Sequence, residues 1–260
     1  MPEADVVRPP QVPPAPPDTA RPAGAAAGTA ATAGRTGPAV LAAALCAVYC
    51  AISLLKFRDL RSTGFDLAIF TEAVRSYAAL EAPVVELKGA GFHLLGDHFH
   101  PVLVTLAPWY RVFPTPVTLL VAQAVLFAVS AYVVGRYAVD RLGRGPGLCL
   151  GAVYGLSYGV QRAVAFDFHE VAFAVPLIAV CVVALARRRW AAAACWALPL
   201  FLVKEDQALI VAGMGAYIFW RGSRWIGAAL AAGAVAAGAV TIFVVIPAFN
   251  AHHHYDYLHS

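Results

Sequence analysis

The sequence predicts an all-α polytopic membrane protein, with about seven transmembrane helices and further surface or re-entrant helices in its first outer loop. The 260 residues are 60% hydrophobic and only 13% charged, with a mean hydropathy of +0.69. Soluble domains carry about twice that charged fraction. Several apolar runs approach or exceed the ~18–20 residues that a helix needs to cross a bilayer. They are continuous rather than alternating, which argues against a transmembrane barrel.

The N-terminal third is predicted to hold a tail, one span and a long outer loop. Residues 1–37 are rich in Pro, Ala, Gly and Thr, and we expect a disordered cytoplasmic tail. No apolar core with a cleavage site precedes the first apolar run, 38–57, so this run is predicted to be an uncleaved span. The outer loop covers 58–115.

Two segments of this loop have a predicted structure. Residues 66–80 have helical spacing and are expected to lie on the membrane surface, with Asp66 as N-cap and Phe65 packing on Phe70. The apolar stretch 102–113 is too short to cross and contains Pro108, which predicts an interfacial or re-entrant piece.

Six further spans complete the predicted transmembrane domain, 38–249. They cover 116–137, 147–164, 171–186, 190–203, 207–220 and 225–249, and a polar, His-rich tail follows at 250–260. Basic side chains cluster in alternate loops, which marks those loops as cytoplasmic. These residues are Arg136, Arg141, Arg144, Arg187, Arg188, Arg189, Arg221 and Arg224. The N-terminus is therefore expected in the cytoplasm and the C-terminal tail outside the plasma membrane.

This topology gathers most acids and every histidine on the outer side. Between Arg189 and Arg221, 31 residues must form two spans and the turn 204–206. Two full crossings need about 40 residues, so this turn is predicted to lie below the outer surface or within a hairpin that does not cross. The turn 166–170 is expected to dip inward in the same way.

The polar residues of these turns have both structural and chemical interpretations. Asp167 and Glu170 have the spacing of a capping box, and Asp206 suits the start of the next helix. The same acids, with the neighbouring His98 and His169, have the chemistry to bind a divalent metal ion or to act as general bases.

Two basic residues are left with open alternatives. Lys204 suits either a phosphate or an ion pair with its acidic neighbours. Arg162 suits either a phosphate or Asp167.

Two classes of function receive no support from the composition. The net charge of +4 follows from topology, so no nucleic-acid partner is expected. The five cysteines all fall in apolar runs without metal-site spacing, and they are interpreted as small core residues.

Four motifs, in order, resemble a known family. They are GFDLAIF at 64–70, GDHFHP at 96–101, FDFHE at 166–170 and VKED at 203–206. Together with the tail at 247–257, they resemble the actinobacterial and cyanobacterial membrane proteins grouped as domain-of-unknown-function family 2079. The resemblance covers about residues 60–257. Members of that family are usually longer, so the resemblance implies a truncated or partial member.

The layout of this family is similar to that of the glycosyltransferase-C superfamily, which transfers sugars from polyprenyl-phosphate carriers outside the cytoplasm. The resemblance implies a lipid-linked sugar as partner besides the bilayer, and a first outer loop that carries a catalytic or metal-binding acid. Asp66 and Asp97 are the expected catalytic residues. The expected phosphate-binding residues are Arg162, Lys204, Glu205 and Asp206, and the expected ligands of a divalent metal ion are His98, Asp167, His169 and Glu170.

Two other functions compete with this hypothesis. The same residues suit the binding cavity of a transporter or of a metal-handling membrane protein. The other alternative is that the chain is a non-catalytic remnant. A transporter requires polar groups that continue through the membrane, and few occur, mainly Gln123, Ser130 and Ser157.

Overall fold

The computed structural model describes residues 23–61 and 64–258, and helices dominate this part of the chain. The first helix, α1 (Ala23–Arg58), begins before the predicted start of the first span at residue 38. Its stretch Thr36–Arg58 is long and apolar enough to cross a membrane. Of the predicted disordered tail, residues 1–22 lie outside the described residues.

Three apolar stretches in the described residues have the length of a span. Besides Thr36–Arg58, they are Val117–Leu142, which is helix α4, and Arg224–Phe249. The last comprises α10 (Arg224–Val240), a π-helical turn η6 (Thr241–Val245) and α11 (Ile246–Phe249). Three of the predicted seven spans are therefore confirmed in length, and the number seven stays a prediction.

The other predicted spans are helical but short or interrupted. Residues 147–164 do not form one continuous helix, because α5 (Arg144–Gly155) ends before Ser157 and α6 (Tyr158–Ala165) starts after it. The remaining four segments are α7 (Ala174–Ala186), α8 (Trp190–Ala197), the 3₁₀ helix η5 (Leu198–Leu202) and α9 (Gln207–Arg221). The stretches Glu170–Ala186 and Trp190–Leu202 are apolar but shorter than a full span.

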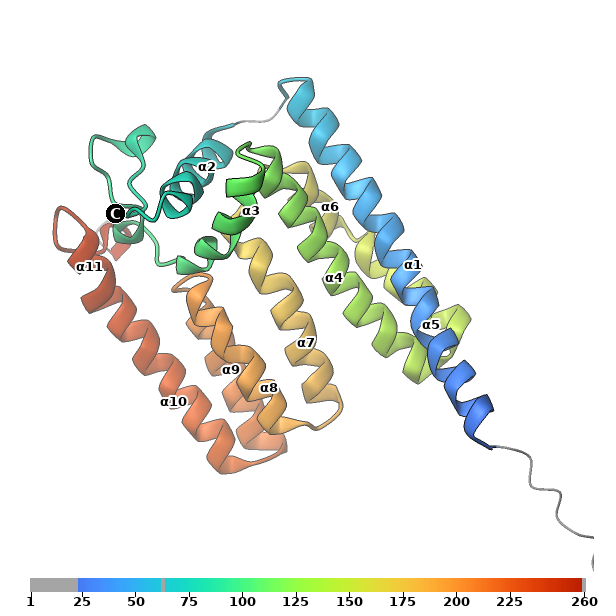
Figure 1. Cartoon of the computed structure of the whole chain (residues 1–260). Coiled ribbons are helices and arrows are strands. Elements are labelled where there is room, and N and C mark those ends of the chain that lie inside the picture. The colour runs from blue at the N-terminus through green and yellow to red at the C-terminus, as the bar shows by residue number, and fades with distance from the viewer. Residues whose placement is uncertain (1–22, 62–63, 259–260) are drawn as a thin grey trace, which may run out of the picture.

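The long helices form a slanted bundle, with α2, α3 and α11 at one end (Figure 1). Helix α4 packs against α1, α5 and α7, while α9 packs against α10. Glycine permits the closest of these approaches. A Cβ at Gly147 would lie 2.4 Å from the Cα of Val139, and a Cβ at Gly227 would lie 2.2 Å from the backbone nitrogen of Phe219. Small residues at such crossings are typical of helix packing in membranes.

Carbonyl groups at the C-terminal ends of α5 and α6 bond to side chains of α1. The Tyr49 hydroxyl donates to the Gly155 carbonyl at 2.6 Å, Ser53 Oγ to Val164 at 3.2 Å, and Lys56 Nζ to Ala165 at 2.5 Å. Helix ends leave carbonyls without intrahelical partners, and these are costly where no water reaches them. Helix α1 therefore stabilises the interrupted segment.

The basic loops meet at the opposite end of the bundle from α2. Arg187 Nη2 donates to Asp140 Oδ2 at 2.8 Å, which joins the loop after α7 to the end of α4. A Cβ at Gly222, after α9, would lie 2.4 Å from the Trp190 ring. The alternation of loops expected from the arginines is therefore present in the fold.

At the other end, the first outer loop folds into short helices. They are α2 (Phe65–Ala78), the 3₁₀ helices η1 (Glu86–Lys88), η2 (Leu94–Gly96) and η3 (Pro101–Leu106), and α3 (Ala107–Val112). Helix α2 buries Leu67, Ile69, Phe70, Ala73 and Val74 against this loop, as its spacing predicts. The short pieces at 101–112 agree with the prediction of a segment that does not cross.

The start of α2 differs from the prediction. Gly64 is the N-cap, with a φ of 75° that favours glycine, and no side chain caps the helix by a hydrogen bond. Asp66 lies inside the first turn, where the helix dipole favours a negative charge. Phe65 is 56% exposed.

Candidate functional site

A polar cavity of about 230 Å³ lies at the α2 end of the bundle. It is enclosed by α2, by the loop around η1 and η2, by the turn at 166–170 and by the turn before α9. The described residues that line it are Phe65, Asp66, Ile69, Phe70, Lys88, Leu94, Asp97, His98, His100, His169, Glu170, Lys204 and Tyr257. Residues from all four sequence motifs therefore meet at one place.

Glu205 is the buried anchor of one wall, although it does not itself line the cavity. Its Oε1 accepts hydrogen bonds from His98 Nδ1 at 2.6 Å and from the Tyr255 hydroxyl at 2.8 Å, and its Oε2 accepts from the Phe99 backbone at 2.9 Å. Burial alone raises the pKa of Glu205, but the bonds from His98 and Phe99 lower it to about 2. The ionised carboxylate thus holds the Nδ1–H tautomer of His98, as assigned from this bond.

Glu170 anchors the opposite wall and is 1% exposed. Its Oε2 lies 2.5 Å from His169 Nδ1, and its Oε1 lies 3.2 Å from Lys204 Nζ. Of the two interpretations of Lys204, the ion pair is present, and the partner is Glu170 rather than an acidic neighbour. A buried carboxylate requires such partners, because an unpaired charge is costly away from water.

Asp97 forms the mouth of the cavity together with two side chains that it contacts. Lys88 Nζ pairs with Asp97 Oδ2, and the Tyr257 hydroxyl donates to Asp97 Oδ1 at 3.3 Å. The Tyr257 ring also stacks on His98, with centroids 4.7 Å apart. The tail that follows α11 therefore covers part of the site.

Asp66 and His100 line the cavity without hydrogen-bond partners among the described side chains. Asp66 is half-buried, and no described residue makes a hydrogen bond or an ion pair with its carboxylate. His100 is buried, its Nδ1 has no partner within the described part, and burial lowers its pKa to about 4. A free carboxylate beside a neutral imidazole can accept a proton from a ligand.

Three predicted site residues lie elsewhere. Asp167 is buried, and its Oδ2 accepts from the Gly64 backbone at 2.7 Å, so it fixes the start of α2. No capping box joins Asp167 to Glu170, since the turn at Glu170–Phe173 (η4) has no side-chain cap. Arg162 on α6 is exposed, and Asp206 Oδ1 accepts from Gln207 Nε2 at 2.9 Å.

The geometry does not provide a preformed metal centre. No group of three or more His, Cys, Asp or Glu side chains within residues 23–61 and 64–258 is arranged to hold a metal ion. The divalent ion at His98, Asp167, His169 and Glu170 therefore stays a prediction from residue types.

Two residues support the site in a way that was not predicted from the sequence. Gln123 of α4 is buried; its Nε2 donates to the carbonyls of Ala163 and Asp167 at 3.2 and 3.4 Å, and its Oε1 accepts from the His169 backbone at 3.0 Å. Asn250 Nδ2 donates to the Gly96 carbonyl at 2.9 Å. A lone amide in an apolar run, as at Gln123, is the signal that indicates such a role.

The helices and their composition define a helical membrane protein. A family model described as "Predicted membrane protein (DUF2079)" matches residues 56–259, and the chain belongs to that family. The resemblance of the four motifs is thereby confirmed. No curated protein and no solved structure matches the chain.

Proposed function

We propose that this chain is a membrane glycosyltransferase-like protein that uses a polyprenyl-phosphate sugar at the outer face of the plasma membrane, with its N-terminus in the cytoplasm. The observation that carries the proposal is Asp66, a carboxylate without a partner among the described residues, in a cavity that also holds Lys88 and Lys204. The two buried carboxylates of the site, Glu170 and Glu205, are by contrast both paired within the protein.

The proposed reaction has one role for each side of the cavity. Asp66 accepts the proton of the acceptor hydroxyl, and the resulting oxygen attacks the anomeric carbon of the sugar. The bond from that carbon to the phosphate oxygen breaks, and polyprenyl phosphate leaves with the electron pair. Lys204 stabilises the leaving phosphate, because its ammonium group lies at the cavity wall against Glu170.

The other predicted residues support this site at a distance. Asp97 positions Lys88, while Glu205 orients His98. Arg162 and Asp206 are outside the cavity lining, so the proposal places the phosphate with the lysines. No step is assigned to a metal ion.

The competing transporter function has less support. Gln123 binds the backbone of the turn at 166–170, and Ser130 donates to the Phe127 carbonyl at 2.8 Å and accepts from Tyr154 at 3.1 Å. These groups are therefore satisfied within the fold and do not line a path for a solute.

The amount of lipid-linked sugar in cells that express this chain tests the proposal. The Asp66→Asn variant is expected to raise the pool of the unused donor, while Glu81→Gln, at an exposed position, leaves it at the wild-type level. Unchanged pools in Asp66→Asn, at equal protein levels, would refute the proposed function.

A further inference from the structure

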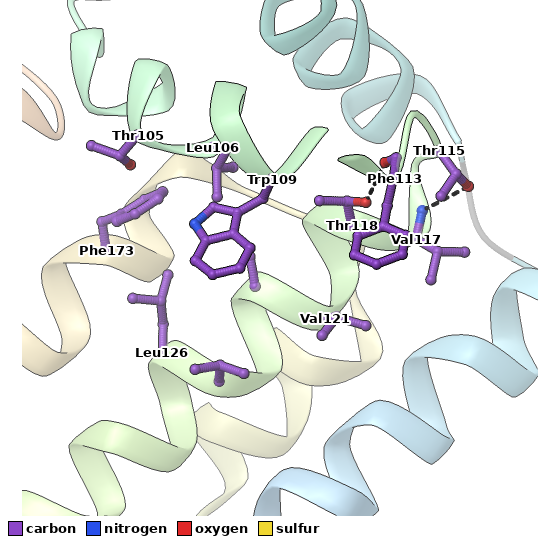
Figure 2. Close-up of a pocket in the computed structure, with 12 residues that line it drawn as sticks. Thr105, Leu106, Trp109, Phe113, Thr115, Val117, Thr118, Val121, Leu126 and Phe173 are labelled. Atoms are coloured by element: carbon purple, nitrogen blue, oxygen red, sulfur yellow. Dashed lines mark hydrogen bonds between the residues drawn. The ribbon is translucent and has the colours of Figure 1, made fainter. Parts of the chain in front are cut away.

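An apolar groove of about 620 Å³ runs along the start of α4, beside the polar cavity. Figure 2 shows the Trp109 side chain between Phe173 and Phe113, with Val121 and Leu126 below it. We refer to it as the α3–α4 groove. Its volume lies in the range of about 300–1,000 Å³ that is usual for small-molecule sites.

The walls of this groove are mostly hydrocarbon, and each of its three threonine hydroxyls makes a hydrogen bond within the protein. Thr105 Oγ1 donates to the Val102 carbonyl at 2.7 Å, and Thr118 Oγ1 donates to the Phe113 carbonyl at 2.7 Å. Thr115 Oγ1 accepts from the Val117 backbone at 3.4 Å. Because most of its lining is apolar and two of the three hydroxyls donate to backbone carbonyls, the groove suits an apolar chain better than a polar ligand.

The length of the groove matches one leaflet of a bilayer. It extends from Val117, the first residue of a candidate span, to Leu126. Nine residues of helix rise about 14 Å, roughly half of a ~30 Å hydrocarbon core. Trp109 is 65% exposed, and an exposed Trp beside the start of a span is typical of the membrane–water interface.

The groove and the polar cavity share two short elements. Glu170 begins η4 and lines the cavity, whereas Phe173 ends it and lines the groove. His100 precedes η3 and lines the cavity, whereas Leu106 ends η3 and lines the groove. Three residues of 3₁₀ helix rise only about 6 Å, so at η4 the groove and the polar cavity lie close together.

We propose that the α3–α4 groove binds the isoprenoid chain of a lipid phosphate whose phosphate end lies in the polar cavity. This inference rests on the proposed function, which supplies the phosphate end. The bilayer is the medium around α4, and it delivers the lipid to the groove from the side, within one leaflet.

Filling the groove with a larger side chain tests this proposal. Val125→Trp and Val121→Trp place an indole in the groove, and Val129→Trp is the matched control. Val125 and Val129 lie on the same helix and are each 44% exposed, but only Val125 lines the groove. The purified full chain in nanodiscs is titrated with undecaprenyl phosphate, with the short citronellyl phosphate and with dioleoyl phosphatidic acid.

We expect the wild type and Val129→Trp to bind undecaprenyl phosphate at least about tenfold more tightly than citronellyl phosphate, a difference that both groove variants lose. Equal affinities in the wild type, or groove variants that behave like Val129→Trp, would overturn the inference. The inference would also be overturned if dioleoyl phosphatidic acid bound the wild type as tightly as undecaprenyl phosphate and bound the same two groove variants more weakly.

A further variant separates this inference from the proposed function. Citronellyl phosphate is too short to fill the groove, and Lys204→Gln is expected to weaken its binding about tenfold. If citronellyl phosphate does not bind, or Lys204→Gln leaves its affinity unchanged, the proposed function fails, whatever the groove variants show.

Discussion

Replacement of Glu205 by Gln removes one buried charge behind a wall of the polar cavity and changes the shape of the side chain very little. The two carboxylate oxygens accept from His98, Phe99 and Tyr255. The amide keeps one oxygen and turns an NH₂ group towards a donor, so at least one buried donor loses its acceptor. A hydrogen bond to a charged group contributes about 1.5–3 kcal/mol. We expect Glu205→Gln to lower the free energy of unfolding by on the order of 3 kcal/mol.

The pKa of Glu205 leads to the same magnitude. It is lowered from the ordinary 4.5 to about 2. A shift of that size corresponds to on the order of 3 kcal/mol, because each pKa unit is about 1.4 kcal/mol. The folded state has the lower pKa, so this stability is present above pH 4.5 and is lost as the pH falls towards about 2.

The assay is an unfolding titration with SDS in mixed micelles, followed by circular dichroism at several pH values. Glu81→Gln is the control, because Glu81 is exposed and makes no contact with the polar cavity. The control is expected to keep the wild-type stability. If the two variants unfold together, Glu205 does not hold the site and the reasoning is refuted.

Three other predictions concern the supports of the site. Burial lowers the pKa of His100 from 6.5 to about 4, so the wild type should lose stability as the pH falls through this range. His100→Leu should remove that dependence, and an unchanged slope of stability against pH in this variant would contradict the prediction. Gly96→Ala would place a Cβ 2.6 Å from the Phe249 carbonyl, so we expect the free energy of unfolding to fall by about 1–3 kcal/mol. The tail after α11 should also be proteolysed faster, and proteolysis at the wild-type rate would contradict this prediction. Gln123→Ala should cost about 2–3 kcal/mol in the same unfolding titration, because three backbone groups lose a buried hydrogen-bond partner. Gln161→Ala should cost less than about 1 kcal/mol, because Gln161 makes one exposed hydrogen bond, to the Leu156 carbonyl. Equal costs for the two variants would contradict this prediction.

The sequence indicated the helical class and the side on which the charged residues gather, because hydropathy and the alternation of arginines are local properties. The short helices α8 and α9 agree with the residue count between Arg189 and Arg221, because a helix has a fixed rise per residue. Glu205 is 5% exposed within the fold, and the depth of this turn below the outer membrane surface stays a prediction.

The sequence did not indicate which groups bind to one another within the site. Asp66 and Asp167 look alike as acids near helix starts, yet Asp167 binds the Gly64 backbone and Asp66 faces the cavity. That difference depends on how α2 packs against the turn at 166–170, which local spacing does not determine. The break between α5 and α6 could not be predicted for a similar reason, because it depends on contacts with another helix. The Tyr49 hydroxyl of α1 donates to the Gly155 carbonyl at the end of α5.

The most direct measurement compares Asp66→Asn with Asp167→Asn in one preparation, by sugar transfer from a labelled polyprenyl-phosphate sugar and by the free energy of unfolding. The account predicts that Asp66→Asn loses transfer at least about a hundredfold. Its stability is predicted to stay within about 1 kcal/mol of the wild type, since only the interaction of its charge with the dipole of α2 is lost. Asp167→Asn is predicted to lose on the order of 2 kcal/mol of stability, because the Gly64 backbone loses a charged acceptor. Wild-type transfer by Asp66→Asn would contradict the account.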